Sequence, residues 1–259
     1  MRSREVLVTD AETPQPDPGQ QLAGRTALVT GGSRGIGRAV AEALAWRGAT
    51  VVVVGLDPDR ASEASAQLVS QGLDVVGVAC DVADPDAVAS LPARLGPLAA
   101  VDVLVNAAGV MAARTAKSLR ADEAEWRRVM GVNLDGAVRV TRSFGPGMVE
   151  RRRGRIINLS ACLGRFTGPG LAGGLAPYRV SKAALNAFTA NLAAETGHGR
   201  RGVLVDATCP GHCRTDMGGS GAPRSAEEGA ATTVWLATRP HDEQTRTGLL
   251  WEDREVVAW

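Results

Sequence analysis

Aromatic side chains are scarce in this 259-residue chain, which has three phenylalanines, five tryptophans and one tyrosine, Tyr178. Lysine is rarer still: Lys117 and Lys182 are the two lysines, and every other Lys/Arg position holds arginine. Residues four apart share a helix face, so Tyr178 and Lys182 are expected to be neighbours unless their spacing is coincidence. An adjacent cation stabilises phenolate and lowers the tyrosine pKa from its free value of about 10. Such a tyrosine can exchange a proton with a carbonyl or an alcohol.

The chain also lacks an excess of charge and any long apolar run. Its formal net charge is +1, which gives no general field toward nucleic acid or an anionic membrane. The one basic run, at 151–155, is interpreted as a solvated helix end. No stretch approaches the ~20 apolar residues of a membrane helix. From these absences we predict that the protein has no nucleic-acid partner and no membrane partner.

Cysteine is sparse too, with four residues and no CxxC pair. That pattern argues against a disulfide framework or a metal site and favours a reduced, cytoplasmic compartment. Residues 1–22 are expected to form a disordered extension without a secretory signal, because acidic residues and prolines cluster there. Residues 23–259 are expected to form one catalytic domain. The preference for Arg, Ala and Gly suggests a bacterial origin.

Short β-branched runs alternate with amphipathic stretches from Arg25 onward. This alternation predicts an α/β fold: a single-domain, Rossmann-like, doubly wound parallel sheet with helices on both faces. The strands are predicted at Thr26–Thr30, Thr50–Val54, Asp74–Ala79, Val101–Asn106, Arg155–Leu159 and Val203–Thr208. Helices are predicted at Gly35–Arg47, Arg60–Ser70, Pro85–Arg94, Asp122–Glu150 and Tyr178–Thr196.

The first predicted strand leads directly into a glycine-rich turn, Thr30–Gly37, and a helix follows. Glycines there permit a tight turn and close approach of the backbone to a diphosphate, which the helix N-terminus can bind. The position between strand and helix makes dinucleotide binding the favoured interpretation over an ordinary turn.

With its TGxxxGxG spacing, the chain resembles the short-chain dehydrogenase/reductases, in particular carbonyl-reductase-like and ketoreductase-like members. The resemblance runs from Leu22 to the C-terminus. The matching pieces, in family order, are Thr30–Gly37, Cys80-Asp81-Val82, Asn106-Ala107-Ala108-Gly109, Asn133, Ser160, Tyr178 with Lys182, Pro210-Gly211 and Thr215. Each residue alone has an ordinary structural explanation, but the ordered set favours function.

The resemblance implies a role for each matching position. Ser160 would hold the substrate oxygen, Tyr178 would transfer the proton, Lys182 would bind the nicotinamide ribose and tune Tyr178, and Asn133 would anchor a water leading to Lys182. Asp81 and Val82 would contact the adenine ring. The implied cofactor-binding residues are Gly31, Ser33, Arg34, Gly35, Ile36, Gly37, Asp81, Val82, Asn106, Ala107, Gly109, Tyr178, Lys182, Pro210, Gly211 and Thr215.

The choice between NADP(H) and NAD(H) depends on the end of the second strand, where an acidic residue would repel a 2′-phosphate. Gly55 occupies the position of the acid in the NAD-using members, and Leu56 the position of a common NADP-binding arginine. Arg34 matches the basic residue of another NADP-using subset, while Asp57 comes two positions late. NADP(H) is therefore favoured and NAD(H) stays possible.

Two stretches depart from the commonest family pattern or match it loosely. Ser160 and Tyr178 lie 18 residues apart, where most members have about a dozen, and a Gly-rich segment separates them. The C-terminal sequence resembles that of carbonyl-reductase-like members less closely than the motifs above resemble the family. Together with His212–Pro223, the Ala161–Pro177 segment is expected to shape the substrate pocket.

The sequence predicts an NADP(H)-dependent oxidoreductase that interconverts a small-molecule ketone or aldehyde and an alcohol. An NAD-dependent secondary-alcohol dehydrogenase is the alternative. A non-catalytic dinucleotide-binding regulator is the remote one, because such a protein has no need of the proton-transfer set. The resemblance also implies a homodimer or homotetramer, paired through the two long predicted helices.

Overall fold

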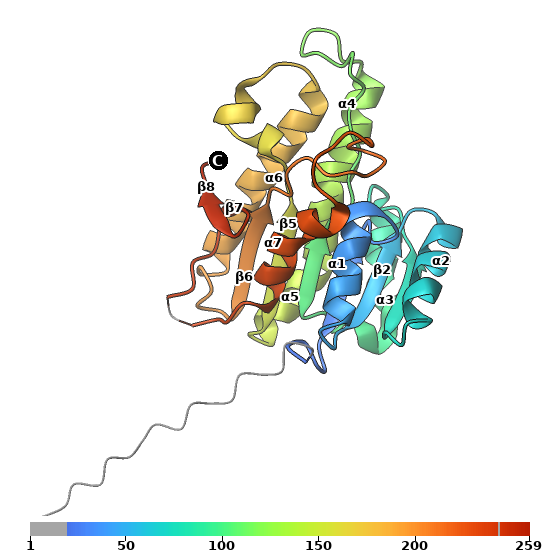
Figure 1. Cartoon of the computed structure of the whole chain (residues 1–259). Helices are drawn as coiled ribbons and strands as arrows, with labels where there is room; N and C mark the ends of the chain where they lie inside the picture. The colour runs from blue at the N-terminus through green and yellow to red at the C-terminus, as the bar shows by residue number, and fades with distance from the viewer. Residues whose placement is uncertain (1–19, 243) are drawn as a thin grey trace, which may run out of the picture.

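A computed structural model describes residues 20–242 and 244–259 of the chain. Eight strands form one sheet in the order β3-β2-β1-β4-β5-β6-β7-β8. Figure 1 shows this sheet with the helices packed around it. Neighbouring strands from β3 to β7 are parallel, and β8 runs antiparallel to β7. The strands are β1 (Thr26–Thr30), β2 (Thr50–Gly55), β3 (Val75–Ala79), β4 (Val103–Asn106), β5 (Gly154–Leu159), β6 (Val203–Thr208), β7 (Leu250–Glu252) and β8 (Glu255–Val257).

Helices cover both faces of the sheet. They are α1 (Gly35–Ala45), α2 (Pro58–Val69), α3 (Pro85–Leu95), α4 (Glu123–Met130), α5 (Ala137–Glu150), α6 (Ala176–Glu195) and α7 (Ala226–Thr238). Alternate residues of β2 enter separate cores: Val51 and Val53 pack with α1 and α7, and Val52 and Val54 pack with α3 and α5. This two-sided burial explains the nearly continuous apolar strands and confirms the predicted doubly wound fold.

The predicted elements match the observed ones to within a few residues, with two differences. The predicted helix Asp122–Glu150 is interrupted by a π-helical segment, Gly131–Gly136, between α4 and α5. The sequence interpretation also missed α7. It missed β7 and β8 as well, because these two C-terminal strands have only three residues each. No helix among the described residues is long and apolar enough to cross a membrane.

The N-terminal boundary lies slightly earlier than predicted. Leu22 was assigned to the extension, yet its side chain is buried and its N–H donates to the Arg47 carbonyl at 2.8 Å. The folded domain therefore includes Leu22. Residues 1–19, which hold most of the predicted extension, lie outside the described residues.

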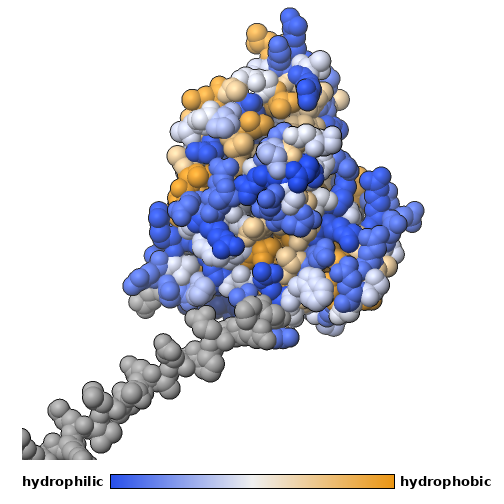
Figure 2. Space-filling model, viewed as in Figure 1, coloured by the Kyte–Doolittle hydropathy of each residue, from blue (hydrophilic) through white to orange (hydrophobic). Residues whose placement is uncertain are grey.

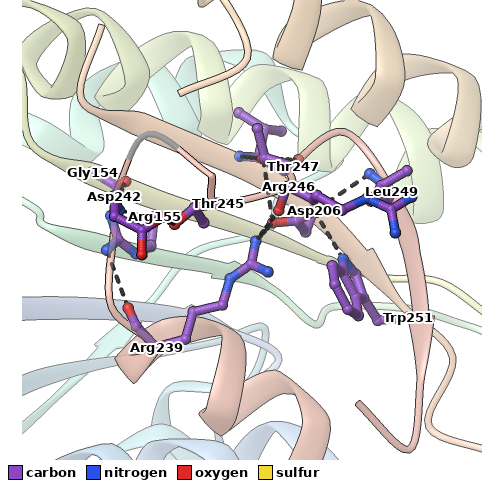
Figure 3. Close-up of polar contacts among 11 residues, drawn as sticks. Gly154, Arg155, Asp206, Arg239, Asp242, Thr245, Arg246, Thr247, Leu249 and Trp251 are labelled. Carbon is purple, nitrogen blue, oxygen red and sulfur yellow. Dashed lines mark hydrogen bonds and ion pairs between the residues drawn. The ribbon is translucent and has the colours of Figure 1, made fainter. Parts of the chain in front are cut away.

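A buried ion pair fastens the C-terminal segment to the sheet, as Figure 3 shows. Arg239, at the end of α7, places its Nη2 2.7 Å from Asp206 Oδ2 on β6. Asp206 also accepts from the Trp251 indole at 2.9 Å, and the Arg239 guanidinium lies 4.9 Å from that ring. Burial raises the pKa of Asp206 and lowers the pKa of Arg239, because both charges are removed from water. These contacts hold β7 beside β6.

The loops that follow the central strands meet at one edge of the sheet. Thr30 pairs with Asn106, and Leu159 pairs with Thr208, so the ends of β1, β4, β5 and β6 lie in register. The loop between β5 and α6 is at the upper left of Figure 1, and apolar side chains gather there in Figure 2. It includes Phe166 and Leu171, each 74% exposed. This edge is where open α/β sheets bind ligands.

Candidate active site

The glycine-rich turn after β1 is packed so closely that side chains cannot replace its glycines. A Cβ on Gly31 would lie 2.8 Å from the Ala108 backbone, and one on Gly37 would lie 2.3 Å from the Gly31 carbonyl oxygen. Gly31 and Gly35 also have positive φ angles of 65° and 53°. The turn therefore brings bare backbone up to the start of α1.

The N-terminus of α1 has no side-chain cap. Its N-cap residue, Arg34, has extended backbone and makes no capping hydrogen bond. The free N–H groups of a helix N-terminus, together with the helix dipole, attract phosphate. By contrast, Asp57 caps α2 by accepting from the N–H groups of Asp59 and Arg60. Because its carboxylate caps α2, we do not assign Asp57 to ribose binding. The predicted phosphate site remains at the glycine-rich turn before α1.

Arg34 contacts the loop after β6. Its guanidinium forms an exposed ion pair with Asp216. Gly55, at the end of β2, faces the same turn, and a Cβ there would lie 3.1 Å from Ser33 Oγ. Leu56 follows and is 71% exposed. The end of β2 therefore carries no acidic side chain at Gly55 or Leu56. Asp216, whose carboxylate pairs with Arg34, comes from the loop after β6.

The end of β4 differs from the sequence expectation in one respect. The Asn106 side chain points into the interior, where its Nδ2 donates to Asn158 Oδ1 at 2.9 Å and to Thr141 Oγ1 at 3.1 Å. Its Nδ2 therefore ties the end of β4 to β5 and α5. Ala107 and Ala108 follow, and their N–H groups donate to Thr30 Oγ1. The backbone of residues 107–109 is thus held beside the glycine-rich turn.

Asp81 and Val82 lie at the loop after β3. The Asp81 side chain is exposed and accepts from the Ala83 N–H at 2.8 Å. Val82 is buried, and a Cβ on Gly136 would lie 2.7 Å from its Cγ2. The loop after β3 thus presents one exposed polar and one buried apolar side chain at this sheet edge.

Asn133 lies in the π-helical segment, and its side chain is buried. Its Oδ1 accepts from the Val110 N–H at 2.7 Å, while Nδ2 donates to the Val110 carbonyl and to Ser181 Oγ. Single π-helical turns inside α-helices are frequent at functional sites. Here the turn places Asn133 between the loop after β4 and helix α6, so that it fixes the position of both.

Ser160 follows β5, as predicted, and the structure adds a partner that the sequence interpretation missed. Ser160 Oγ donates to Asn186 Oδ1 at 2.5 Å, and Asn186 Nδ2 donates to the Gly164 carbonyl at 3.3 Å. Asn186 follows Lys182 by four residues, so the same helical spacing that joined Tyr178 and Lys182 could have pointed to it. Its side chain sets the orientation of the Ser160 hydroxyl.

Tyr178 and Lys182 lie on one face of α6, as their spacing predicted. The Lys182 Nζ is 5.8 Å from the centre of the Tyr178 ring and donates to the Leu159 carbonyl at 2.6 Å. Burial lowers the pKa of Lys182 to about 8. Burial also raises the pKa of Tyr178, and the nearby thiols of Cys162 and Cys209 add to the rise. In this arrangement burial outweighs the expected lowering of the tyrosine pKa by the ammonium.

A small apolar cluster surrounds Tyr178. It contains Ala112, Ala116, Val129 and Ala161, with Leu163 and Leu175 packed against it. The segment after β4 therefore forms a wall beside Tyr178 that the sequence interpretation did not include. Within the segment His212–Pro223, Thr215 lies next to the glycine-rich turn, because a Cβ on Gly35 would lie 3.2 Å from its Cγ2.

The loop after β6 begins with Pro210 and Gly211. Gly211 has φ of 72°, and a Cβ there would lie 2.9 Å from Arg224 Cδ. The loop then doubles back, with the Arg214 N–H donating to the Arg224 carbonyl at 2.8 Å. It brings Thr215 and Asp216 to the start of α1.

Known proteins share this sequence pattern. The family model for short chain dehydrogenase matches residues 25–225. The 3-oxoacyl-[acyl-carrier-protein] reductase FabG of Vibrio cholerae is 39% identical over 197 residues, which cover 76% of each chain. Galactitol 2-dehydrogenase (L-tagatose-forming) of Cereibacter sphaeroides is 37% identical over 240 residues, 92% of this chain and 87% of the other.

Solved structures share the fold over nearly the whole chain. A 3-oxoacyl-[acyl-carrier protein] reductase of Brucella melitensis with bound NAD is 31% identical, with a TM-score of 0.79 over 98% of this chain and 96% of that one. A metagenomic short-chain oxidoreductase in complex with NADP is 31% identical, with a TM-score of 0.76 over 90% and 99%. The cofactor class is thus a nicotinamide dinucleotide, and the prediction of an enzyme is confirmed. This chain belongs to the short-chain dehydrogenase/reductase family of oxidoreductases.

Proposed function

We propose that this protein is an NADP(H)-dependent oxidoreductase that interconverts a ketone or aldehyde and an alcohol, with Tyr178 as the proton donor and acceptor. The observation that carries the proposal is the placement of Tyr178, Lys182 and Ser160 at the same sheet edge as the uncapped start of α1. A proton-transfer group and a diphosphate site are both needed for hydride chemistry on a carbonyl.

The residues at this edge fit a nicotinamide dinucleotide. Gly31 and Gly35 leave room for close approach, and the free N–H groups of α1 suit a diphosphate. When bound, the nicotinamide supplies or accepts the hydride. Asp81 and Val82 would face the adenine, and Lys182 and Thr215 would hold the nicotinamide end.

The chain's own residues handle the proton. Ser160, oriented by Asn186, would hold the substrate oxygen through its hydroxyl. Because burial raises the pKa of Tyr178, the phenol is protonated at neutral pH and can donate a proton as a carbonyl oxygen gains negative charge. In the oxidation direction Tyr178 must first lose that proton, so alcohol oxidation should speed up as pH rises. Asn133 would keep α6 and the loop after β4 in register, and the proposed water leading to Lys182 would lie beside it.

The preference for NADP(H) rests on Arg34 and Gly55. Among residues 20–242 and 244–259, Asp216 is the one carboxylate that pairs with Arg34. Arginine–phosphate contacts are charge-assisted and often bidentate. An exposed ion pair is worth about 0–1 kcal/mol, so a 2′-phosphate can displace Asp216. A secondary-alcohol dehydrogenase using NAD(H) is the alternative, and Gly55 gives it no ribose-binding carboxylate.

Substitution of Arg34 tests the cofactor assignment. Arg34→Ala should cost about 1.5–3 kcal/mol of NADPH binding, roughly tenfold or more, and leave NADH affinity nearly unchanged. Arg47→Ala, at the far end of α1, is the matched control and should change neither. Gly55→Asp should reverse the preference, with a shift of the Ser33 hydroxyl to admit the new side chain. Fluorescence titration of both cofactors gives the affinities, and equal losses in Arg34→Ala would refute the assignment.

The substrate is a small molecule, and a panel of 3-oxoacyl thioesters, ketones, sugar alcohols and simple secondary alcohols tests the class. Each compound is assayed with both cofactors in both directions by nicotinamide absorbance. Turnover of at least one ketone–alcohol pair is expected. Binding of cofactor without turnover of any compound would favour the non-catalytic regulator.

Self-association through α5 and α6 is part of the proposal. An open groove of about 670 Å³ runs between these helices, and its apolar lining includes Val138, Pro146, Val149, Phe188 and Leu192. A second copy of the chain would cover this surface in a homodimer or homotetramer. Light scattering should give a dimer or tetramer, and Phe188→Glu should shift it toward monomer. The free cysteines of the described residues suit a reduced, cytoplasmic setting.

A further inference from the structure

Two cysteines that the proposed reaction does not use lie together behind Tyr178. Cys162 is two residues after Ser160, in the short 3₁₀ turn Cys162–Gly164, and Cys209 directly follows β6. Cys162 packs against the small cluster that contains Cys209 and Leu250. The strands that precede the two cysteines are paired, with Leu159 opposite Thr208, so the cysteines follow neighbouring strand ends. Residues far apart in sequence thus place a thiol pair at the active-site edge.

The surroundings of the pair distinguish its two members. Cys209 is buried, and its Sγ donates to Glu252 Oε1 at 3.5 Å, while Glu252 is paired with Arg165 at 3.4 Å. Cys162 is partly exposed. Contact with the Cys209 thiol lowers the pKa of Cys162, and the same contact together with burial raises the pKa of Cys209. Cys162 is therefore suited to act as the nucleophile, and Cys209 to act second.

The other two cysteines make an internal comparison. Cys80 and Cys213 are both buried, and burial raises the pKa of each thiol. The Cys213 Sγ donates to the Pro210 carbonyl at 3.3 Å. Reactivity toward oxidants follows thiolate character and exposure, and these two thiols have neither.

We propose that Cys162 and Cys209 form an oxidisable dithiol, which hydrogen peroxide converts into an intramolecular disulfide that slows the enzyme. The Cys162 thiolate attacks one peroxide oxygen, which breaks the O–O bond and gives the sulfenic acid and hydroxide. The proton that Cys162 released to solvent converts this hydroxide into the first water. Glu252 takes the proton of Cys209, whose sulfur then attacks the Cys162 sulfur. The departing hydroxide leaves as water with the proton from Glu252. In sum two thiols and one peroxide give one disulfide and two waters, and the two electrons lost by sulfur reduce the peroxide.

The disulfide links the loop that carries Ser160 to the loop that begins at Pro210. Closing the packing contact between the two cysteines to an S–S bond of about 2.05 Å draws the two loops together. A displacement of about 1 Å in a catalytic group can cost on the order of 10²-fold in rate. Turnover should therefore fall at least about tenfold on oxidation and return with dithiothreitol. The bond itself does not depend on the proposed function, whereas its effect on turnover does.

The test treats the full-length protein with hydrogen peroxide and maps its cysteines by peptide mass spectrometry after alkylation. A peptide pair joined through Cys162 and Cys209, removed by dithiothreitol, is the expected result. Oxidation confined to Cys80 or Cys213, over-oxidation of Cys162 without the bond, or no reaction at all would each overturn the proposal.

Variants separate the bond from its consequence. Cys162→Ser and Cys209→Ser should each abolish the disulfide and the reversible loss of turnover, while Cys80→Ser and Cys213→Ala should keep both. A mapped disulfide with unchanged turnover overturns the claim that it slows the enzyme. Should no substrate of the reduced protein be found, the proposed function fails instead, and the disulfide map still decides whether the dithiol exists.

Discussion

Replacement of Lys182 by methionine should make the protein more stable at neutral pH while it removes function. Lys182 Nζ is buried and donates to the Leu159 carbonyl at 2.6 Å. Burial lowers its pKa from 10.5 to about 8, which at ~1.36 kcal/mol per pKa unit is a cost of roughly 3 kcal/mol for holding the charge in the folded state. Methionine keeps most of the side-chain volume without the charge.

The pH dependence gives this prediction its sign. A lysine with a lowered folded-state pKa binds fewer protons when folded than when unfolded, so stability rises with pH between about 8 and 10.5. Below pH 8 the cost is fully present. The stability advantage of Lys182→Met over the parent should therefore be largest at pH 7 and shrink by roughly 2.5 kcal/mol by pH 10.

Urea unfolding at pH 7, 8.5 and 10, at one fixed protomer concentration, measures that difference. Lys117→Met is the matched control, because Lys117 is exposed and is the other of the chain's two lysines. The control should match the parent at all three pH values. An advantage of Lys182→Met that stays constant with pH would refute the claim that Lys182 is held in a charge-disfavouring site.

Two further variants test the scaffold around the site. Arg239→Met leaves Asp206 buried beside Trp251 without its cation. The free energy of unfolding, measured in urea, should fall by about 3–5 kcal/mol. A fall below about 1 kcal/mol would mean that the ion pair does not hold β7 beside β6. Gly37→Ala should weaken NADPH binding about tenfold or more and destabilise the fold by about 1–3 kcal/mol, since its Cβ would lie 2.3 Å from the Gly31 carbonyl oxygen. Gly131→Ala is its control, with the nearest atom at 3.9 Å, and unchanged NADPH binding in Gly37→Ala would argue against the turn as the diphosphate site.

Strands and helices whose pattern is strongly periodic could be predicted from the sequence. The parallel sheet was expected from strands such as β2, where four consecutive valines are buried on two faces. The π-helical turn around Asn133 could not be predicted, because its geometry comes from contacts of Asn133 with Val110 and Ser181, far away in sequence. The short β7 and β8 depend on tertiary pairing in the same way, through Asp206 and Trp251.

The site residues divide along similar lines. The Tyr178–Lys182 spacing and the glycine-rich turn follow from local geometry, so sequence placed them correctly on α6 and before α1. The orientation of Asn106 into the interior and the Asn186 contact to Ser160 depend on packing between elements. The direction of the Tyr178 pKa also needed the structure, because burial, which sequence does not measure, opposes the ammonium.

The central claim, that Tyr178 exchanges the proton during hydride transfer, is tested most directly by the turnover number of Tyr178→Phe. Phenylalanine keeps the ring in its apolar cluster and removes the hydroxyl, so NADPH affinity should stay within about twofold of the parent. On a substrate found with the carbonyl panel, kcat should fall by about 10²–10⁴-fold, the usual contribution of a positioned acid–base group. Tyr178 is the only tyrosine, so no other phenol can replace it. Retention of more than about a tenth of the parent kcat would contradict the account, because the proton would then come from another group.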